Sequence, residues 1–166
     1  MSSQIPLGGF NPPLFIEIDG RDTTDPGVRP VVHNFKVSPG YFETIGVRII
    51  RGRPFGDSDR AAGEPVAIVS ETAARILGNG RDPIGERLRF RPDAPWMTVI
   101  GVAGDVRNRR LTEQPQPILY RSLEQSSDLS LALLIRTRGD TPGLGASVAR
   151  EVRNVDPDLR SIPCVR

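Results

Sequence analysis

The sequence contains very few of the side chains that usually carry out catalysis or hold a metal ion. Its 166 residues include one cysteine, Cys164, and one histidine, His33. A single cysteine excludes an internal disulfide, and one histidine and one cysteine far apart in the chain form no recognisable zinc site. His33 has no carboxylate at a recognisable spacing, so we interpret it as a structural or surface residue. We therefore expect no metal ion, no cofactor and no catalytic residue.

The other residues that could support catalysis also lack a typical pattern. Asp57 and Asp59 lie in a turn-like segment, where aspartate is favoured for local hydrogen bonds. The sequence has no G-x-S-x-G motif around Ser70 and no G-x-x-x-x-G-K-S/T motif, so it predicts neither a serine nucleophile nor a P-loop for ATP. An enzyme of an unrecognised type would need a strongly perturbed ionisable residue inside a cleft.

Long apolar runs are missing as well. No run approaches the roughly 18 residues that a membrane-spanning helix requires. The first residues lack the basic and then apolar pattern of a signal peptide. By itself, the sequence therefore predicts neither a membrane anchor nor export.

The charge of the chain does not favour a polyanionic partner. The formal net charge is only +2, although 21 of the 22 basic residues are arginine. Arg87, Arg89 and Arg91 alternate with a period of two, which places them on one face of a strand, and we expect this face to be solvated. Only Phe90 and Trp96 lie near them, whereas a nucleic-acid surface needs more stacking aromatics. We therefore expect no nucleic-acid partner.

Residues 37–55, with the sequence VSPGYFETIGVRIIRGRPF, predict a compact strand, helix and strand. Ser38 is a candidate helix cap, Pro39 suits the first turn, and Gly46 can end the helix. The apolar run that follows is closed by glycine and proline. The apolar face of this helix would consist of Tyr41, Phe42 and Ile45.

The rest of the chain alternates apolar runs with polar turns, which indicates an α+β protein. Ser70 should cap a second helix that ends at Gly78, and a third helix is predicted from Leu144 to Val155. The apolar side of the second helix would be formed by Ala73, Ala74, Ile76 and Leu77. Further strands are predicted at about 14–19, 31–37, 66–69, 88–90, 96–102, 118–123, 129–137 and 159–165. Of these, 129–137 is the most strand-like, and the strands at 88–90 and 96–102 should form a hairpin.

Five motifs in order resemble the MacB-like periplasmic core domain of ABC-transporter-type, FtsX-like permeases. The first is SPGYF followed by RGRPF in residues 38–55. The others are PVAIVSETAARIL at 65–77, DPIGERLRF at 82–90, VIGVAGDVR at 99–107, and LLIRTRGD with a later DPDL between 133 and 159. The resemblance covers about 14–160. The chain departs from the pattern at Arg110, where a small residue usually precedes the leucine.

The resemblance implies a fold and a division into parts. It implies an α+β fold with a mixed sheet packed against helices, which is porter-like, and a smaller inserted α/β subdomain. Residues 1–13 would be an irregular lead-in, and residues 14–166 the periplasmic core domain. The main subdomain would comprise 14–70 and 117–166, and the inserted one about 71–116.

The resemblance also marks a set of motif residues, which we interpret as structural. They are Ser38, Pro39, Gly40, Tyr41, Phe42, Gly52, Arg53, Asp82, Pro83, Gly85, Gly104, Asp105 and Arg107.

The function implied by the resemblance is that of a non-catalytic, extracytoplasmic domain of a permease subunit in the bacterial inner membrane. Such a domain would couple movement of the membrane helices to substrate export or to a periplasmic partner. Its partners would be its own transmembrane helices, a second permease half or subunit and, indirectly, a cytoplasmic ATPase. Met1-Ser2-Ser3 directly before the family-like segment suggests a piece excised from such a protein. The alternative is a small-ligand-binding sensor domain of a membrane protein.

Overall fold

The protein is described by a computed structural model that divides into two compact units, Met1–Leu134 and Ile135–Arg166. The described residues are 1–3, 12–21, 29–106, 114–126 and 131–156.

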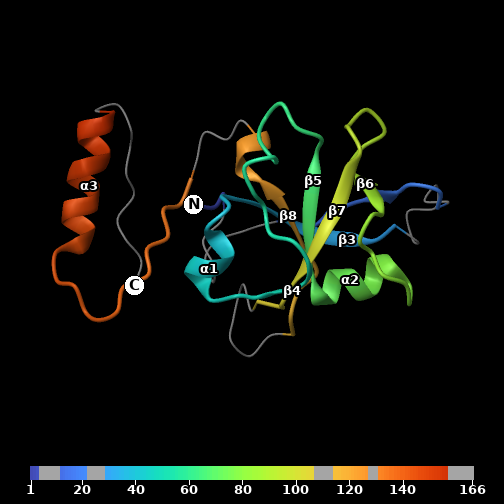
Figure 1. Cartoon of the computed structure of the whole chain (residues 1–166), viewed down its shortest axis with the longest axis horizontal. Coiled ribbons are helices and arrows are strands. Elements are labelled where there is room, and N and C mark those ends of the chain that lie inside the picture. The colour runs from blue at the N-terminus through green and yellow to red at the C-terminus, as the bar shows by residue number, and fades with distance from the viewer. Residues whose placement is uncertain (4–11, 22–28, 107–113, 127–130, 157–166) are drawn as a thin grey trace. The chain divides into compact units, whose positions relative to one another are not determined.

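In this described part, eight strands form one mixed sheet in the first unit (Figure 1). They are β1 (Leu14–Phe15), β2 (Glu17–Ile18), β3 (Val31–Val37), β4 (Ile49–Gly52), β5 (Val66–Ser70), β6 (Arg87–Arg89), β7 (Met97–Ala103) and β8 (Ile118–Ser122). The order is β1-β3-β8-β5-β7-β6-β2, and β4 pairs with β7 off this path. The pairs β3–β8 and β5–β7 are parallel and the others antiparallel. The α+β fold with a mixed sheet is confirmed.

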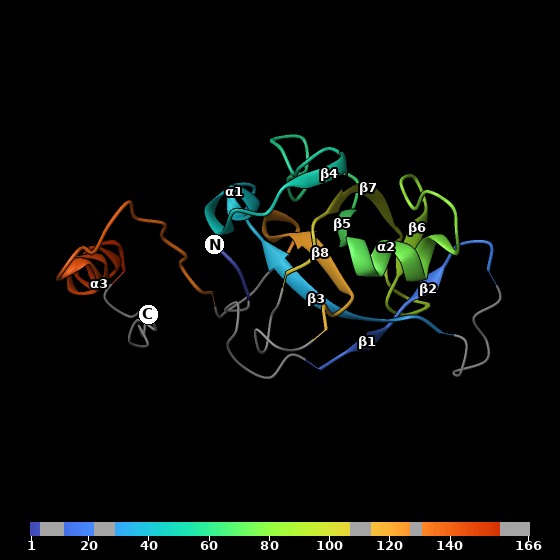
Figure 2. The same cartoon turned by 90° about the horizontal axis from the view of Figure 1, so that it is seen from below.

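The two ends of this strand order are joined by a single extended segment. β1 pairs with β3, β2 pairs with β6, and only Ile16 separates β1 from β2 (Figure 2). The amide of Ile16 donates to the carbonyl of Pro30 at 3.0 Å, and its side chain is fully buried. Residues 14–18 therefore nearly close the sheet into a ring, which leaves fewer open strand edges than a flat sheet has.

The sheet carries a hydrophobic cluster on each face, because successive strand residues point to opposite sides. In β5, Ala67 and Val69 belong to one cluster and Val66 and Ile68 to the other. The prediction that this strand is buried on both faces is confirmed. The first cluster receives side chains from β2, β3, β5, β6, β7 and β8, and from the helix that follows β5.

That helix, α2 (Glu71–Gly78), follows the sequence prediction closely. The hydroxyl of Ser70 accepts from the amide of Ala73 at 3.2 Å, which confirms the cap, and Asn79 ends the helix in the left-handed conformation. Ile76 was expected on the apolar side, but it is 44% exposed. The reason is that only Ala73, Ala74 and Leu77 face the first cluster.

The helix α1 (Tyr41–Ile45) ends at Gly46 as predicted, but its start is different. Gly40 is the N-terminal cap residue and makes no side-chain bond, so the predicted cap by Ser38 is wrong. The hydroxyl of Ser38 instead accepts from the amino group of Met1, and Ser38 lies two residues before the cap position. Tyr41 and Phe42 are buried in the second cluster.

The predicted strand at 129–137 is wrong for its described residues, 131–137. They form no strand, and Ala132 makes only an isolated bridge with Ser2. Leu131 and Leu133 are each about half exposed. Apart from this bridge, the described residues 131–137 pair with no strand, although their sequence favours one. A sequence of high β-propensity forms a strand only where a neighbouring strand packs against it.

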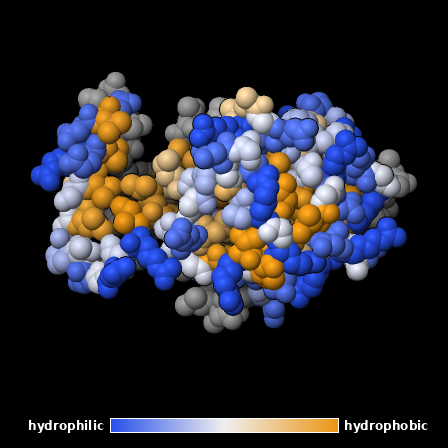
Figure 3. All heavy atoms as spheres, viewed as in Figure 1, coloured by the Kyte–Doolittle hydropathy of each residue, from blue (hydrophilic) through white to orange (hydrophobic). Residues whose placement is uncertain are grey.

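In the second unit, the helix α3 (Leu144–Val155) has the predicted bounds. Its apolar residues lie along one stripe, with polar residues on the opposite side (Figure 3). None of its residues is buried. The predicted strand at 159–165 lies outside the described residues, and the division into a main and an inserted subdomain stays a prediction.

Gly52 allows β4 to approach β7 very closely. Its φ is +71°, and a Cβ built on it would lie 2.2 Å from the carbonyl oxygen of Ile100. This oxygen is held in place because it accepts from the amide of Arg53 at 3.0 Å. A side chain at position 52 would therefore separate the two strands.

We expect Gly52→Ala to lower the free energy of unfolding by about 2 kcal/mol or more, because left-handed strain and a backbone clash add together. Urea denaturation of the 166-residue chain measures this change. Gly56→Ala is the matched control, because a Cβ added there would meet no atom within 4 Å and its φ is not positive. Equal stability of the two variants would contradict the close approach.

Two buried tyrosines make a second test of the core. Tyr41 and Tyr120 lie with ring centroids 6.0 Å apart, and neither hydroxyl has a hydrogen-bond partner among the described residues. Burial raises the pKa of Tyr41 to about 12 and also raises the pKa of Tyr120. A buried, unsatisfied hydroxyl costs free energy.

We expect Tyr120→Phe to leave the free energy of unfolding unchanged or raise it by about 1 kcal/mol, because the phenylalanine ring keeps the packing and removes an unsatisfied group. Thermal and urea unfolding at pH 7 measure the effect. A loss of more than about 1 kcal/mol would show that the hydroxyl is hydrogen-bonded in solution.

Candidate interaction surface

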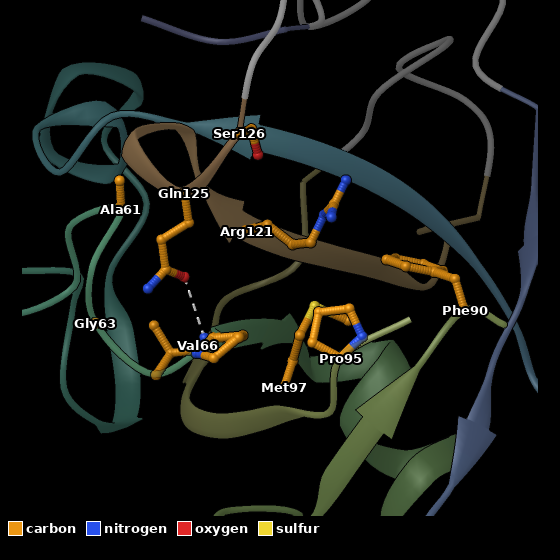
Figure 4. A pocket seen from close by; sticks show the side chains of 10 residues that line it. Ala61, Gly63, Val66, Phe90, Pro95, Met97, Arg121, Gln125 and Ser126 are labelled. Carbon is orange, nitrogen blue, oxygen red and sulfur yellow. Dashed lines mark hydrogen bonds between the residues drawn. The ribbon is translucent and has the colours of Figure 1, made fainter. Parts of the chain in front are cut away.

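The candidate site is a surface hollow of about 140 Å³ in the first unit (Figure 4). One wall is the loop between β4 and β5, the opposite wall is the hairpin between β6 and β7, and the end of β8 with the short 3₁₀ helix η1 (Leu123–Gln125) lies between them. The hollow is lined by Ala61, Gly63, Pro65, Val66, Phe90, Pro95, Met97, Arg121, Gln125 and Ser126. We name it the β8 hollow.

An ion pair between the half-exposed Arg53 and the buried Asp59 holds the loop wall in shape. The guanidinium of Arg53 donates two hydrogen bonds to the carboxylate of Asp59, at 2.7 and 2.9 Å. Asp59 also accepts from the amide of Gly56 at 2.8 Å, and its own carbonyl accepts from the hydroxyl of Ser122 at 3.0 Å. Asp59 is 3% exposed. We call these four residues the Asp59 clasp, and it ties the loop to the end of β8.

The electrostatics of the clasp follow from this geometry. The hydrogen bonds from Arg53 hold the pKa of Asp59 below its usual value, and burial opposes them in part. The same hydrogen bonds raise the pKa of Arg53. Both groups therefore remain charged at neutral pH, and the pair is bidentate, which is the stronger geometry.

Gln125 makes a second connection between the loop wall and the end of β8. Its amide nitrogen donates to the carbonyls of Glu64 and Arg60, at 2.8 and 3.2 Å. Its amide oxygen accepts from the amide of Val66 at 3.2 Å. One side chain thus satisfies three backbone groups in the chain that leads into β5.

Among the described residues that line the hollow, Arg121 is the only charged one. Its Nε donates to the amide oxygen of Asn34 at 3.0 Å, and its guanidinium lies 5.0 Å from the centre of the Phe90 ring. In Figure 4 the side chain extends from β8 toward Phe90 along one side of the hollow. Both contacts help to direct the guanidinium along this side of the hollow.

The hairpin wall is held by charges at the seam between β2 and β6. Glu17, which is mostly buried, accepts from Nε of Arg89 at 2.8 Å and lies 3.7 Å from Arg29. The guanidinium of Arg89 also stacks over Trp96, 4.3 Å from the ring centre. The expectation of a solvated arginine face therefore holds for Arg87 and Arg91, whose side chains are mostly exposed, but is wrong for Arg89.

The described motif residues lie at several places in the first unit, and only Arg53 belongs to the clasp. Tyr41 and Phe42 are in the second cluster, and Ser38, Pro39 and Gly40 precede α1. Gly104 donates its amide to the carbonyl of Arg48 at 3.0 Å. Arg107 lies outside the described residues, as does Arg110.

Two motif aspartates bond to nearby backbone amides. Asp105 accepts from the amide and the hydroxyl of Thr72, at 2.8 and 2.7 Å, in the first turn of α2, where a negative charge is favourable. Asp82 accepts from the amide of Ile84 at 3.1 Å, between α2 and β6. Pro83 is buried beside it, and Gly85 has a φ of +88°. A structural role for the whole motif set stays a prediction.

Sequence reasoning missed the importance of Asp59 and Gln125. Asp59 was interpreted as a turn residue, and its six-residue spacing from Arg53 was the available signal. No sequence pattern marked Gln125. Among the described residues, no group of three or more histidine, cysteine, aspartate or glutamate side chains could hold a metal ion.

A family model described as the MacB-like periplasmic core domain matches residues 13–153. The chain belongs to this family. The fold of this chain is also similar to that of solved structures. The periplasmic region of MacB from Actinobacillus actinomycetemcomitans is similar with a TM-score of 0.63 and 13% identity, over 92% of this chain and 69% of that one. A domain of a putative permease from Porphyromonas gingivalis is similar with a TM-score of 0.59 and 17% identity, over 94% and 79%.

A curated relative extends the comparison to a whole protein. A probable export ATP-binding/permease protein of Pseudomonas fluorescens is 38% identical over 73 residues, which are 43% of this chain and 11% of that protein. The chain is thus a periplasmic region of a MacB-like membrane permease. Within the described residues, no helix is both long and apolar enough to span a membrane.

We expect Asp59→Asn to lower the free energy of unfolding by about 1–3 kcal/mol at pH 7, because Arg53 and the amide of Gly56 lose a charged acceptor. Asp57→Asn is the matched control, since the Asp57 side chain is 95% exposed, and it should change stability by less than about 0.5 kcal/mol.

The pH dependence of the stability lost in Asp59→Asn gives an independent check. Because the folded pKa of Asp59 is lowered, its stabilisation is present above the unfolded pKa of about 4 and disappears as the pH falls through the folded pKa. The difference in free energy of unfolding between the original chain and Asp59→Asn should therefore be constant from pH 5 to 7 and shrink below pH 4. A difference that does not change with pH would contradict the ion pair.

Proposed function

We propose that this domain is a non-catalytic coupling element, which passes movement of the permease's membrane helices to substrate export or to a periplasmic partner. The observation that carries the proposal is the nearly closed sheet of the first unit. A body that transmits movement must not deform under load, and a sheet joined at both ends by residues 14–18 resists opening at an edge.

The packing of this unit supports the same function. The strands β5 and β8 lie centrally in the strand order, and each sends side chains into the clusters on both faces. Interiors packed in this way are close-packed and transmit strain rather than absorb it. A displacement applied at one end of the first unit would therefore appear at the other.

The proposed partners follow from the family and from the curated relative. They are the domain's own transmembrane helices, a second permease half or subunit, and a periplasmic protein. A cytoplasmic ATPase would act on the domain only through the membrane helices. The name of the Pseudomonas relative, an export ATP-binding/permease protein, supports ATP-driven export for the parent of this chain.

The alternative function, a sensor of small ligands, receives no support from the β8 hollow. Pockets for small molecules usually enclose roughly 300–1,000 Å³. The hollow has about 140 Å³, which is less than half of the lower bound.

Distance measurements between spin labels in the full-length permease test the coupling proposal. Cys164→Ser removes the one thiol of this chain, and cysteines elsewhere in the permease are replaced in the same way. Glu43→Cys with Arg81→Cys then places labels on two exposed positions of the first unit. We expect the 43–81 distance distribution to remain unchanged between the nucleotide-free and the ATP-trapped states. Labels at position 81 of the two permease halves should change their separation between the same states.

Two outcomes would count against the proposal. If the 43–81 distribution shifts with nucleotide, the unit deforms instead of moving as one body. If neither distance changes, the domain does not follow the ATPase cycle at all.

A further inference from the structure

We propose that, in the full-length permease, the residues directly before Met1 form a strand that pairs antiparallel with the backbone of residues 133–137. We call these residues the preceding segment. The inference goes beyond the coupling function, because it names the part of the permease that completes the sheet next to the N-terminus of this chain.

Ser2 already lies between two extended stretches of chain. It forms antiparallel bridges with Val37 of β3 on one side and with Ala132 on the other. The amide of Ser2 donates to the carbonyl of Ala132 at 3.0 Å, and the amide of Ala132 donates to the carbonyl of Ser2 at 2.7 Å. On the β3 side, the amide of Ser38 donates to the carbonyl of Met1 at 2.9 Å. The first residues of the chain are therefore paired on both sides, as in an inner strand.

The direction of the bridge to Ala132 determines where the preceding segment would lie. In an antiparallel pair, one chain ascends while the other descends, so Met1 is opposite Leu133 and the residue before Met1 would be opposite Leu134. Ser2 and Ala132 exchange both hydrogen bonds, so the next pair to exchange them would include Leu134. An extended chain before Met1 would therefore run beside the backbone that follows Ala132.

Residues 131–135 already have the side-chain alternation of a strand. Leu131, Leu133 and Ile135 are 46%, 52% and 49% exposed, whereas Leu134 packs against the second cluster. Such a period of two is that of an extended chain. Among the described residues, none accepts a hydrogen bond from the amide of Leu134. The backbone here is arranged for a neighbouring strand that the described part of the chain does not supply.

Connectivity favours the preceding segment over any other occupant. It is attached to Met1, so its local concentration at this edge is far above that of a separate peptide or a second copy. A chain that enters Met1 in an extended form also occupies the edge beside Leu134 and excludes other strands. The relatives provide room for such a segment, since this chain spans only 69% of the similar periplasmic region of MacB.

The register also gives the chemistry of the preceding segment. Ser2 is fully buried and lies opposite Val37, which belongs to the second cluster. Because side chains alternate along a strand, the residue directly before Met1 would face the same cluster, beside Leu134. We expect an apolar residue there, since a charged side chain would be buried without a partner. A charged residue at this position of the gene would contradict the register.

Disulfide formation in the full-length permease tests this register. The starting protein is the cysteine-free permease of the spin-label experiment. One new cysteine replaces the second residue before Met1, and the other is Ile135→Cys, which the register places opposite it in a non-hydrogen-bonded pair, the closer kind. With copper phenanthroline as oxidant, this pair should cross-link at least about tenfold faster than the same first cysteine with Thr137→Cys, because position 137 lies two residues further along the ladder.

Hydrogen exchange tests the same pairing without any substitution. The amide of Leu134 should exchange at least about a hundredfold more slowly in the full-length permease than in the 166-residue chain, because it would donate to the preceding segment. The amide of Leu133 is the internal control. It points to the opposite edge, since successive amides of a strand alternate, and its exchange should change much less.

Four results would overturn the inference. They are a gene that starts at Met1, cross-linking of the Ile135→Cys pair no faster than that of the Thr137→Cys pair, a cross-linked product that joins two permease chains, and equal exchange of the Leu134 amide in both proteins. A product of two chains would make a second copy the occupant. None of these results bears on the 43–81 distance, so the inference can fail while the coupling function stands.

Discussion

The pairing of β2 with β6 is the contact on which the rest of the first unit depends. It involves only two residues on each strand, yet it converts an open sheet into a nearly closed one. Glu17 lies at this seam and is largely buried, so its charge must be paired to avoid a large desolvation cost. Arg89 supplies the pairing and also stacks on Trp96, so that closure of the sheet and the shape of the hairpin depend on the same arginine.

Much of this fold could be predicted from local sequence signals. The strand β5 is a continuous apolar run, and α2 has a serine cap, so both elements are determined by residues adjacent in the sequence. The segment 131–137 shows the limit of this approach. Its residues 131–135 are all apolar, but a strand also requires a neighbour, and local sequence does not specify whether one is present.

The interaction surface was harder to predict, because its parts come together only in the folded chain. Arg53 and Asp59 are six residues apart, but Ser122 and Gln125 reach the same loop from about 60 residues away. Arg121 is directed by Asn34, which lies 87 residues earlier on a parallel neighbour. A single sequence contains no signal for such contacts, whereas the family motif did point to Arg53.

Two kinds of contact hold the first unit together. The ring is held by backbone hydrogen bonds and by clusters of buried apolar side chains on both faces. The walls of the β8 hollow are held mainly by side-chain hydrogen bonds and ion pairs at the surface. Asp59 and Glu17 are largely buried in these walls, so the loss of an arginine partner would leave a buried charge unpaired. The shape of the walls therefore depends on a few charged side chains, whereas the ring beneath them depends on many apolar contacts.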